Sequence, residues 1–252
     1  MIKIIMHGCN GAMGRTITNI VREDNDTEIV AGIDLNTAIE NEYPVFPSLA
    51  ECKVEADVII DFASTKAVSG LLTYAVEQNV PVVLCTTGLS KEQVEEVREA
   101  SKKVAILRSA NMSLGINMLL KLIKEAAKTL APAGFDIEIV EKHHNKKIDA
   151  PSGTALALAD SINEAMDGQY EYVYDRSREN KARNKKELGI SAVRGGTIVG
   201  EHEIIFAGTD EVITFEHTAY SKAIFAKGSV SAAKYLAGRR AGLYDMSDVI
   251  NG

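Results

Sequence analysis

Gly8-Cys9-Asn10-Gly11-Ala12-Met13-Gly14 follows the apolar residues 2–6 and leads into the helical stretch of residues 15–23. This order of strand, glycine-rich turn and helix predicts a loop whose backbone can approach a pyrophosphate group closely. Unpaired N–H groups at the start of the following helix favour the negative charge of such a group. The glycine spacing, G-x-x-G-x-x-G, is a variant of the commoner G-x-G-x-x-G, so its interpretation depends on the residues that follow.

An acidic residue at the expected place supports this interpretation. Asp34 ends the second apolar segment, 20 residues beyond Gly14, where an acid accepts hydrogen bonds from the adenosine ribose of a bound dinucleotide. The alternative, in which the glycines only form a tight turn and Asp34 is a solvated loop residue, explains this spacing less well. Asp34 repels a 2′-phosphate and its neighbours Leu35 and Asn36 offer no cation, which favours NADH, while Arg15 leaves NADPH open.

Apolar segments alternate with polar helical stretches in the first part of the chain. Besides residues 2–6, the apolar segments are residues 28–33, 58–62, 80–85 and 104–108. Near-continuous apolar strands separated by helices predict a parallel sheet that is covered on both faces. This part of the chain is therefore expected to be an α/β, Rossmann-like dinucleotide-binding domain.

The pattern changes after a helix that is expected to follow Gly115. Residues 135–139 and 211–215 alternate between apolar and polar side chains, and residues 203–206 form another short apolar segment. These segments predict the partly solvated sheet of a second, α+β domain. The cationic residues 176–186 are expected to form an exposed loop, and they receive no role.

Composition argues against several classes of function. A net charge of −7 over 252 residues argues against a general nucleic-acid binder, because phosphate contacts supply non-specific affinity for a polyanion. The sequence has no apolar run of about 18 residues, so neither a membrane span nor a signal peptide is expected, and the expected compartment is the cytosol. Cys9, Cys52 and Cys85 are far apart and form no Cys-x-x-Cys pair, so free thiols are expected.

A second informative segment concentrates cations in this acidic protein: Glu141-Lys142-His143-His144-Asn145-Lys146-Lys147-Ile148-Asp149-Ala150-Pro151-Ser152-Gly153-Thr154. It runs from a strand end into a helix at Ala155, and Ser152 is a natural N-cap for that helix. With Gly153 and Thr154, Ser152 presents N–H and hydroxyl donors that suit a carboxylate. The adjacent histidines can supply a group that titrates near neutral pH, and a lysine four residues on can donate a proton or hold a second carboxylate.

Two other interpretations of this segment were weighed. In the first, His143 and His144 are partly exposed polar residues, and Lys146 and Lys147 belong to a solvated loop. The capped helix that follows makes this interpretation less favoured. In the second, the two histidines bind a metal, but neighbours on an extended chain point in opposite directions and no Cys, Asp or Glu completes the usual spacing. No metal is therefore expected.

Residues 143–155 resemble the signature segment of the dihydrodipicolinate reductase family. Other segments of this family occur in the family's order, so the resemblance covers nearly the whole chain. They are residues 8–15, Asp61-Phe62, Thr86-Thr87-Gly88, residues 110–117, Gly200-Glu201-His202 and residues 242–246.

The resemblance implies two domains and a specific reaction. Residues 1–113 plus 222–252 are expected to form the Rossmann-like dinucleotide-binding domain, and residues 114–221 an α+β domain that binds substrate and assembles a homotetramer through its sheets. The implied reaction is the NAD(P)H-dependent reduction of 4-hydroxy-tetrahydrodipicolinate, a small dicarboxylate, to tetrahydrodipicolinate. This step belongs to lysine biosynthesis through the diaminopimelate pathway and is expected in the cytoplasm, without a nucleic-acid or membrane partner.

The resemblance also implies roles for individual residues. It implies that His143 is the acid/base residue and Lys147 a proton donor, with the substrate contacted by His144, Gly153 and Thr154. The implied cofactor contacts are Gly8, Cys9, Asn10, Gly11, Ala12, Met13, Asp34, Cys85, Thr86, Thr87, Ala110, Asn111, Met112 and Ser113.

The chain departs from the family's pattern at three positions. Cys85 stands where the family usually has glycine, and Lys222 and Ser231 stand where it often has arginine. Because lysine cannot make a planar bidentate grip, these two changes put in doubt whether that corner holds cofactor or substrate as in other members.

Two rival functions are considered. Another two-domain Rossmann reductase, such as a semialdehyde or diaminopimelate dehydrogenase, shares the expected fold. A semialdehyde dehydrogenase needs an activated cysteine, and neither Cys52 nor Cys85 has a basic partner visible in the sequence. A regulator that binds dinucleotide without turnover is the second rival, and His143 and Lys147 argue against it.

Overall fold

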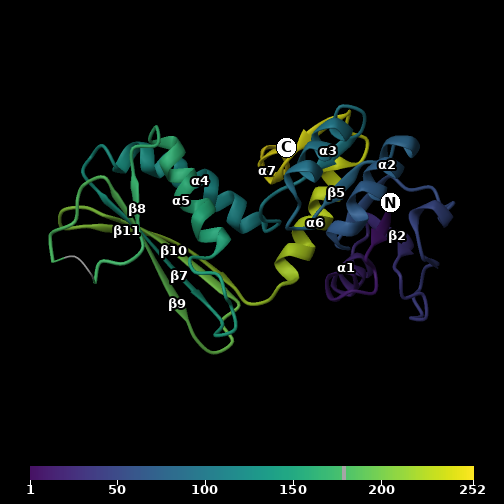
Figure 1. Cartoon of the computed structure of the whole chain (residues 1–252), viewed down its shortest axis with the longest axis horizontal. Helices are drawn as coiled ribbons and strands as arrows, with labels where there is room; N and C mark the ends of the chain where they lie inside the picture. Colours follow the sequence, from purple (N-terminus) through teal and green to yellow (C-terminus); the bar gives the residue numbers. More distant parts are fainter. Residues whose placement is uncertain (178–179) are drawn as a thin grey trace. The chain divides into compact units, whose positions relative to one another are not determined.

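The computed structural model describes residues 1–177 and 180–252, which form two compact units (Figure 1). Unit 1 comprises Met1–Leu114 and Ala223–Gly252, and unit 2 comprises Gly115–Lys222. Each boundary lies one residue later than in the division expected from the sequence, so Lys222 falls in unit 2. None of the helices in the described ranges has both the length and the apolar character that a membrane-spanning segment requires.

Unit 1, in which every residue is described, is built on a parallel sheet in the order β12-β6-β5-β4-β1-β2-β3. Six of these strands have the Rossmann order 3-2-1-4-5-6, in which the direction of winding reverses between β1 and β4. Ligands of such sheets bind at the carboxyl ends of the strands beside this reversal. The strands are β1 (Ile2–His7), β2 (Thr27–Ile33), β3 (Val45–Phe46), β4 (Val58–Asp61), β5 (Val82–Leu84), β6 (Ala105–Leu107) and β12 (Gly242–Tyr244).

Helices cover both faces of this sheet, which confirms the predicted α/β class. Ile4 and Met6 of β1 pack with α1 and α6 in one buried cluster, whereas Ile5 packs with α2 and α3 in another. Successive strand residues point to opposite faces, so each needs an apolar side chain. The helices of unit 1 are α1 (Ala12–Arg22), α2 (Val68–Gln78), α3 (Lys91–Ser101), α6 (Ala223–Leu236) and α7 (Met246–Asn251), with short 3₁₀ turns at Leu49–Glu51 and Thr65–Ala67.

Helix α1 begins earlier than the sequence pattern predicts. It starts at Ala12 rather than at Arg15, with Gly11 as an extended N-cap (φ −71°, ψ 168°). Gly14 therefore lies within the helix, where a Cβ atom would sit 2.3 Å from the carbonyl oxygen of Gly8. Because Gly14 has no Cβ atom, the first turn of α1 can pack against the backbone of Gly8. The helix can therefore begin within the glycine motif.

Unit 2 contains a mixed sheet with one covered face. Its described strands have the order β11-β10-β7-β9-β8, and helices α4 and α5 pack on one side of it around a single buried cluster. Along β7, Ile137 and Ile139 are fully buried while Glu138 between them is partly exposed, which confirms the predicted alternation. The elements are α4 (Leu114–Leu130), β7 (Asp136–His143), α5 (Gly153–Ala165), β8 (Glu171–Val173), β9 (Glu187–Arg194), β10 (Gly200–Ala207) and β11 (Val212–Ala219).

The cationic segment of residues 176–186 was expected to be solvated, and this expectation is wrong for Arg183. Arg183 forms ion pairs with Asp136 and Glu138, and only 19% of its side chain is exposed. Arg176 also pairs with Glu138, at 3.0 Å. These carboxylates lie on the uncovered face of β7, and Arg176 and Arg183 contact that face through them. Positions 178 and 179 of this segment lie outside the described residues.

Candidate active site

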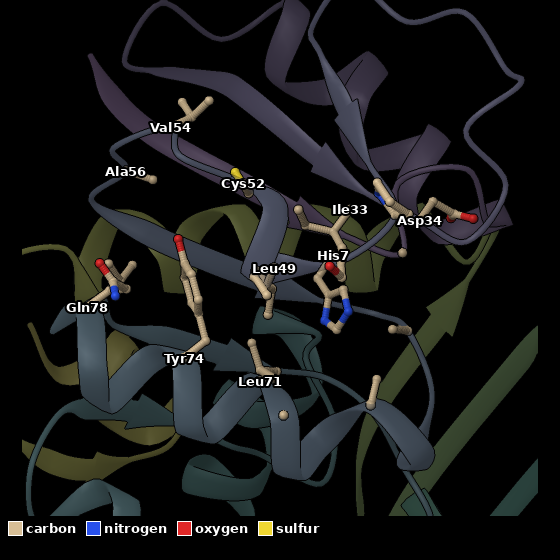
Figure 2. A pocket seen from close by; sticks show the side chains of 18 of the residues that line it. His7, Ile33, Asp34, Leu49, Cys52, Val54, Ala56, Leu71, Tyr74 and Gln78 are labelled. Carbon is tan, nitrogen blue, oxygen red and sulfur yellow. The ribbon is translucent and has the colours of Figure 1, made fainter.

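A pocket of about 1480 Å³ lies in unit 1 and includes part of the carboxyl edge of its sheet. Figure 2 shows His7 and Asp34 at one end of this pocket, and Tyr74 and Gln78 of α2 toward the other. Gly8 and Gly11 also line it. The structure thus brings the glycine motif and Asp34 to one hollow, as their spacing predicts.

The glycine motif forms a backbone cradle that fits a pyrophosphate. Gly8 has φ +83°, and a Cβ atom on it would lie 2.9 Å from the carbonyl oxygen of Phe62. The N-cap Gly11 has no side chain to cap the helix, and the first turn of α1 contains no acidic residue. Helix N–H groups without a side-chain partner carry partial positive charge, which suits an anion.

Asp34 is oriented by the glycine motif itself. Its Oδ2 accepts a hydrogen bond from the Asn10 backbone N–H at 3.0 Å, and its Oδ1 accepts one from the Asn36 N–H at 3.0 Å. The Asn10 side chain donates to the Asn36 carbonyl at 2.6 Å, which ties the two loops together. A carboxylate has about four lone-pair sites, so Asp34 can still accept hydrogen bonds from a ribose.

A buried carboxylate holds the segment after β5 to the same edge. Asp61 is fully buried; its Oδ2 accepts from the Thr86 hydroxyl at 2.6 Å, and its carbonyl accepts from the Cys85 N–H at 3.0 Å. His7 Nδ1 lies 2.8 Å from Asp61 Oδ1, although not in hydrogen-bond geometry. Thr86 and Thr87 therefore follow the strand next to β4, but they do not line the hollow that contains Asp34.

The segment after β6 lies at the same edge, also outside that hollow. Met112 and Ser113 are buried, and the Met112 carbonyl packs so closely on Gly228 of α6 that a Cβ there would lie 1.7 Å away. Asn111 Oδ1 accepts from the Ser113 N–H at 2.8 Å, and Ala110 is exposed. Burial limits Met112 to backbone contacts with any ligand at this edge.

The cysteines of unit 1 lack the features of a catalytic thiolate. Burial, aided by the negative charge of Asp61, raises the pKa of Cys85 well above its ordinary value. Burial also raises the pKa of Cys9 to about 11. Cys52 is 3% exposed and is packed among apolar residues. A mechanism through a thioester, which needs an accessible thiolate, has no support at these positions.

In unit 2, the strand β7 places a glutamate and a histidine side by side. Glu141 and His143 continue the inward-facing series of Ile137 and Ile139, because alternate residues of a strand share a face. His143 Nδ1 lies 2.6 Å from Glu141 Oε2. Glu141 is fully buried and His143 is 8% exposed. The arrangement is a carboxylate–imidazole pair, which suits proton transfer at the other ring nitrogen.

Neighbouring strands complete this cluster. In the sheet register, His143 is opposite Arg194 of β9, and Glu141 is opposite His202 of β10. Arg194 donates two hydrogen bonds to Glu141, at 2.8 and 2.7 Å. Although burial opposes it, the hydrogen bonds from Arg194, His143 and the Ser152 N–H lower the pKa of Glu141. Glu141 is therefore ionised near neutral pH.

The helix that follows the basic segment begins as the sequence predicts. Ser152 caps α5, since its Oγ accepts from the Ala155 N–H at 3.1 Å. Gly153 and Thr154 are the first two helical residues, and the start of a helix is a place that suits an anion. The ammonium group of Lys147 forms an ion pair with Asp149 at 2.9 Å, and the backbone N–H of Lys147 donates a hydrogen bond to the carbonyl of His144.

Three residues of this cluster were missed from the sequence: Glu141, Arg194 and His202. Glu141 was recoverable, because extending the alternation of residues 135–139 by two more steps puts it on the face of His143. His202 lies in a segment that carried the family resemblance, but it received no role. Arg194 gave no signal, since the pairing of β7 with β9 is not readable from sequence.

His202 makes a testable contribution to stability. Burial, together with positive charge on His143 and Lys147, lowers the pKa of His202 to about 4. An unfolded histidine titrates near 6.5, so between these values the unfolded chain binds a proton that the folded chain does not. The stabilisation is complete above pH 6.5 and is lost as pH falls toward 4, by roughly 3 kcal/mol in total.

Urea unfolding near neutral pH and near pH 5 measures this effect. Between these pH values we expect His202→Gln to lose less stability than the natural protein, because glutamine does not titrate. Carboxylates with lowered pKa values lose their contribution only below about pH 4.5, so this window isolates histidines. Equal losses in the two proteins would contradict the assignment.

Family models match nearly the whole chain. The model described as "Dihydrodipicolinate reductase, N-terminus" matches residues 2–112, and "Dihydrodipicolinate reductase, C-terminus" matches residues 115–250. The two matched regions therefore meet close to the first boundary between unit 1 and unit 2.

Individual relatives are similar over their full lengths. A 4-hydroxy-tetrahydrodipicolinate reductase of Caldanaerobacter subterraneus subsp. tengcongensis is 54% identical over 250 residues, which cover 99% of this chain and 98% of the relative. A protein of the same name from Clostridium tetani is 47% identical over 251 residues, covering 100% and 98%. A solved dipicolinate-bound dihydrodipicolinate reductase from Paenisporosarcina sp. TG-14 matches with a TM-score of 0.81 and 25% identity, covering 97% of each chain.

Proposed function

Because this chain belongs to the dihydrodipicolinate reductase family, we infer that it is an oxidoreductase that reduces 4-hydroxy-tetrahydrodipicolinate with NAD(P)H. The products are tetrahydrodipicolinate and the water lost from the hydroxylated substrate, and the reaction belongs to lysine biosynthesis through the diaminopimelate pathway. The observation that carries this conclusion is the family match over both units. The buried Glu141–His143 pair supports it further, since the reduction needs a proton source.

We propose that unit 1 is the dinucleotide-binding domain. When bound, the nicotinamide cofactor supplies the hydride. The backbone of residues 8–13 holds the pyrophosphate, and Asp34 accepts hydrogen bonds from the adenosine ribose. The segments after β5 and β6 contact the nicotinamide side, through Cys85, Thr86, Thr87, Ala110, Asn111, Met112 and Ser113. Their place at the carboxyl edge of a parallel sheet supports this assignment.

Unit 2 is proposed to bind the substrate and to move the proton. The N-terminus of α5, at Gly153 and Thr154, binds one substrate carboxylate, and His144 contributes to the same contact. Each hydride added to the substrate must be balanced by a proton. His143 offers Nε2 for this transfer because its Nδ1 is bound to Glu141, and the Lys147 ammonium is a second donor.

Assembly and compartment complete the proposal. The face of the unit 2 sheet opposite α4 and α5 carries Val193 and Val212, which are 45% and 62% exposed. We propose that this face joins copies of the chain into a homotetramer, whose mass light scattering measures directly; a monomeric mass contradicts it. Three buried free cysteines are consistent with a reducing compartment, which supports the cytoplasm.

The reaction is tested with purified protein and freshly generated 4-hydroxy-tetrahydrodipicolinate. We expect loss of nicotinamide absorbance that depends on the substrate. If neither NADH nor NADPH is oxidised, the chain is not this reductase, and a dinucleotide-binding regulator becomes the better interpretation.

The same assay measures cofactor preference. We expect kcat/KM with NADH to exceed that with NADPH by about tenfold, because Asp34 repels a 2′-phosphate and its Oδ2 is held at the glycine motif by the Asn10 N–H. Asp34→Asn removes the negative charge and is expected to lower the ratio of kcat/KM with NADH to kcat/KM with NADPH. A natural protein that prefers NADPH, or a ratio that Asp34→Asn leaves unchanged, contradicts the role of this carboxylate.

A further inference from the structure

Glu141 is a fully buried carboxylate whose hydrogen-bond partners all belong to the candidate active site. Its Oε1 accepts from Arg194 Nη2 at 2.7 Å and from the Ser152 N–H at 3.0 Å. Its Oε2 accepts from Arg194 Nη1 at 2.8 Å and lies 2.6 Å from His143 Nδ1. An isolated buried carboxylate is strongly destabilising, so a protein that retains one has to pair it this completely.

Arg194 does more than neutralise this charge. Its two parallel hydrogen bonds to both oxygens fix the plane of the Glu141 carboxylate, which a lysine cannot do. Arg194 Nη2 is itself anchored to the carbonyl of Asp149 at 2.6 Å. The carboxylate plane is thereby tied to the basic segment, and Oε2 is aimed at the imidazole.

The His143 ring is constrained from three sides. Nδ1 faces Glu141, and one ring edge meets His202 in a T-shaped contact, with centroids 5.2 Å apart. Gly200 of β10 lies beside Nε2, where an added Cβ would be only 3.1 Å from that nitrogen. An ionised Glu141 can only accept a hydrogen bond, so the Nδ1 position carries a proton and Nε2 is the exchanging nitrogen.

We propose that Glu141 and Arg194 are positioning residues, which hold His143 with Nδ1–H on the carboxylate and Nε2 toward the substrate. This inference rests on the proposed function. In the step, the Nε2–H bond of the imidazolium breaks and the proton passes to the substrate. The Nδ1–H bond stays intact and keeps donating its hydrogen bond to Glu141. Nε2 then takes up a proton from solvent, and this is the proton that the overall reduction consumes. Glu141 and Arg194 act only through His143, so they stabilise its orientation and charged form without touching substrate.

The central variant is Glu141→Gln. The amide keeps the shape of the side chain but can donate to Nδ1, which favours the wrong tautomer of His143. We expect kcat to fall by at least roughly a hundredfold, since loss of a general acid lowers the rate by about 10²–10⁴ and loss of an orienting carboxylate by about 10⁴. KM for the substrate and affinity for NADH are expected to change little, since neither contact involves Glu141. Arg194→Lys keeps the positive charge but loses the two parallel hydrogen bonds, and its kcat is expected to fall less than that of Glu141→Gln.

A spectroscopic measurement separates positioning from general damage. The chain has 5 histidines, so nitrogen NMR of labelled full-length protein can follow the tautomer of His143. We expect a protonated Nδ1 with a strong hydrogen bond in the natural protein, and loss of this state in Glu141→Gln. Glu138→Gln is the matched control. It removes an arginine-paired carboxylate from the opposite face of the same strand, and it is expected to keep both the tautomer and kcat.

Removal of one partner of a buried ion pair can prevent folding, so a double variant is included. Glu141→Met with Arg194→Met exchanges the whole pair for apolar side chains, which proteins often tolerate. This folded double variant is expected to be as slow as Glu141→Gln. If the natural protein turns over and the Glu141 variants keep its kcat, or Glu141→Gln keeps its His143 tautomer, the proposal is overturned. A natural protein without turnover instead refutes the proposed function.

Discussion

Replacing His143 with alanine is expected to lower kcat by roughly a hundredfold or more, the usual scale for loss of a general acid. His143 presents the exchanging nitrogen of the buried carboxylate–imidazole pair, and alanine leaves no group there to deliver the proton. Affinity for NADH is expected to stay close to that of the natural protein, because the cofactor residues belong to unit 1. Stopped-flow turnover and a separate NADH titration distinguish the two effects.

Two companion variants make this result specific to the Nε2 position. His217→Ala removes another histidine from the same sheet and is expected to keep kcat near its natural value. Gly200→Ala keeps His143 but puts a methyl group about 3.1 Å from Nε2, and it is expected to slow turnover. Unchanged kcat in His143→Ala would remove this residue from the mechanism, whatever the companions show.

Much of unit 1 could be predicted because its determinants are local. Residues 2–6 and 58–62 are near-continuous apolar runs, which are typical of a sheet covered on both faces. The glycine motif and Asp34 follow their strands directly, so their place at the carboxyl edge follows from parallel topology alone. The edge strands Val45–Phe46 and Gly242–Tyr244 were not predicted, because two or three residues are too few to show a period.

The cluster in unit 2 depends on contacts between residues far apart in the chain. Ser152, Gly153 and Thr154 were readable as a helix start, since capping is a local property. Arg194 reaches Glu141 across 53 positions of sequence and through a parallel pairing. The buried Leu188 and Ile190 fix which face of β9 turns inward, but the sequence does not show that β9 pairs with β7 or which residue of β9 lies opposite His143. Tertiary structure was therefore needed to identify the positioning pair.

The same contrast explains the error at residues 176–186. A run of charges is solvated by default, because each charge is usually better hydrated than paired. Here the uncovered face of β7 presents Asp136 and Glu138 in alternate positions, and Arg183 contacts both. These partner charges lie 47 and 45 residues before Arg183 in the sequence, so the local pattern could not reveal them.

Gly14 is a position in unit 1 where one added methyl group is expected to disturb both a helix and the glycine motif. A Cβ there would lie 2.3 Å from the Gly8 oxygen and 2.5 Å from the Cys9 oxygen. Both are backbone atoms of the cofactor loop, so no rotation of a side chain can relieve the overlap. Either α1 or the loop has to move, and the N–H groups that we propose to hold the pyrophosphate move with it.

We therefore expect Gly14→Ala to weaken NADH binding by at least about tenfold and to destabilise the protein by roughly 1–3 kcal/mol, the range for overpacking. Gly70→Ala is the matched control, because Gly70 is also helical but has no atom within 4 Å of an added Cβ. Alanine there is expected to stabilise α2 by up to about 1 kcal/mol, since glycine is a poor helix former. NADH fluorescence titration and urea unfolding measure both quantities. If Gly14→Ala binds NADH as tightly as Gly70→Ala does, close approach of helix and loop is not what forms the cofactor site.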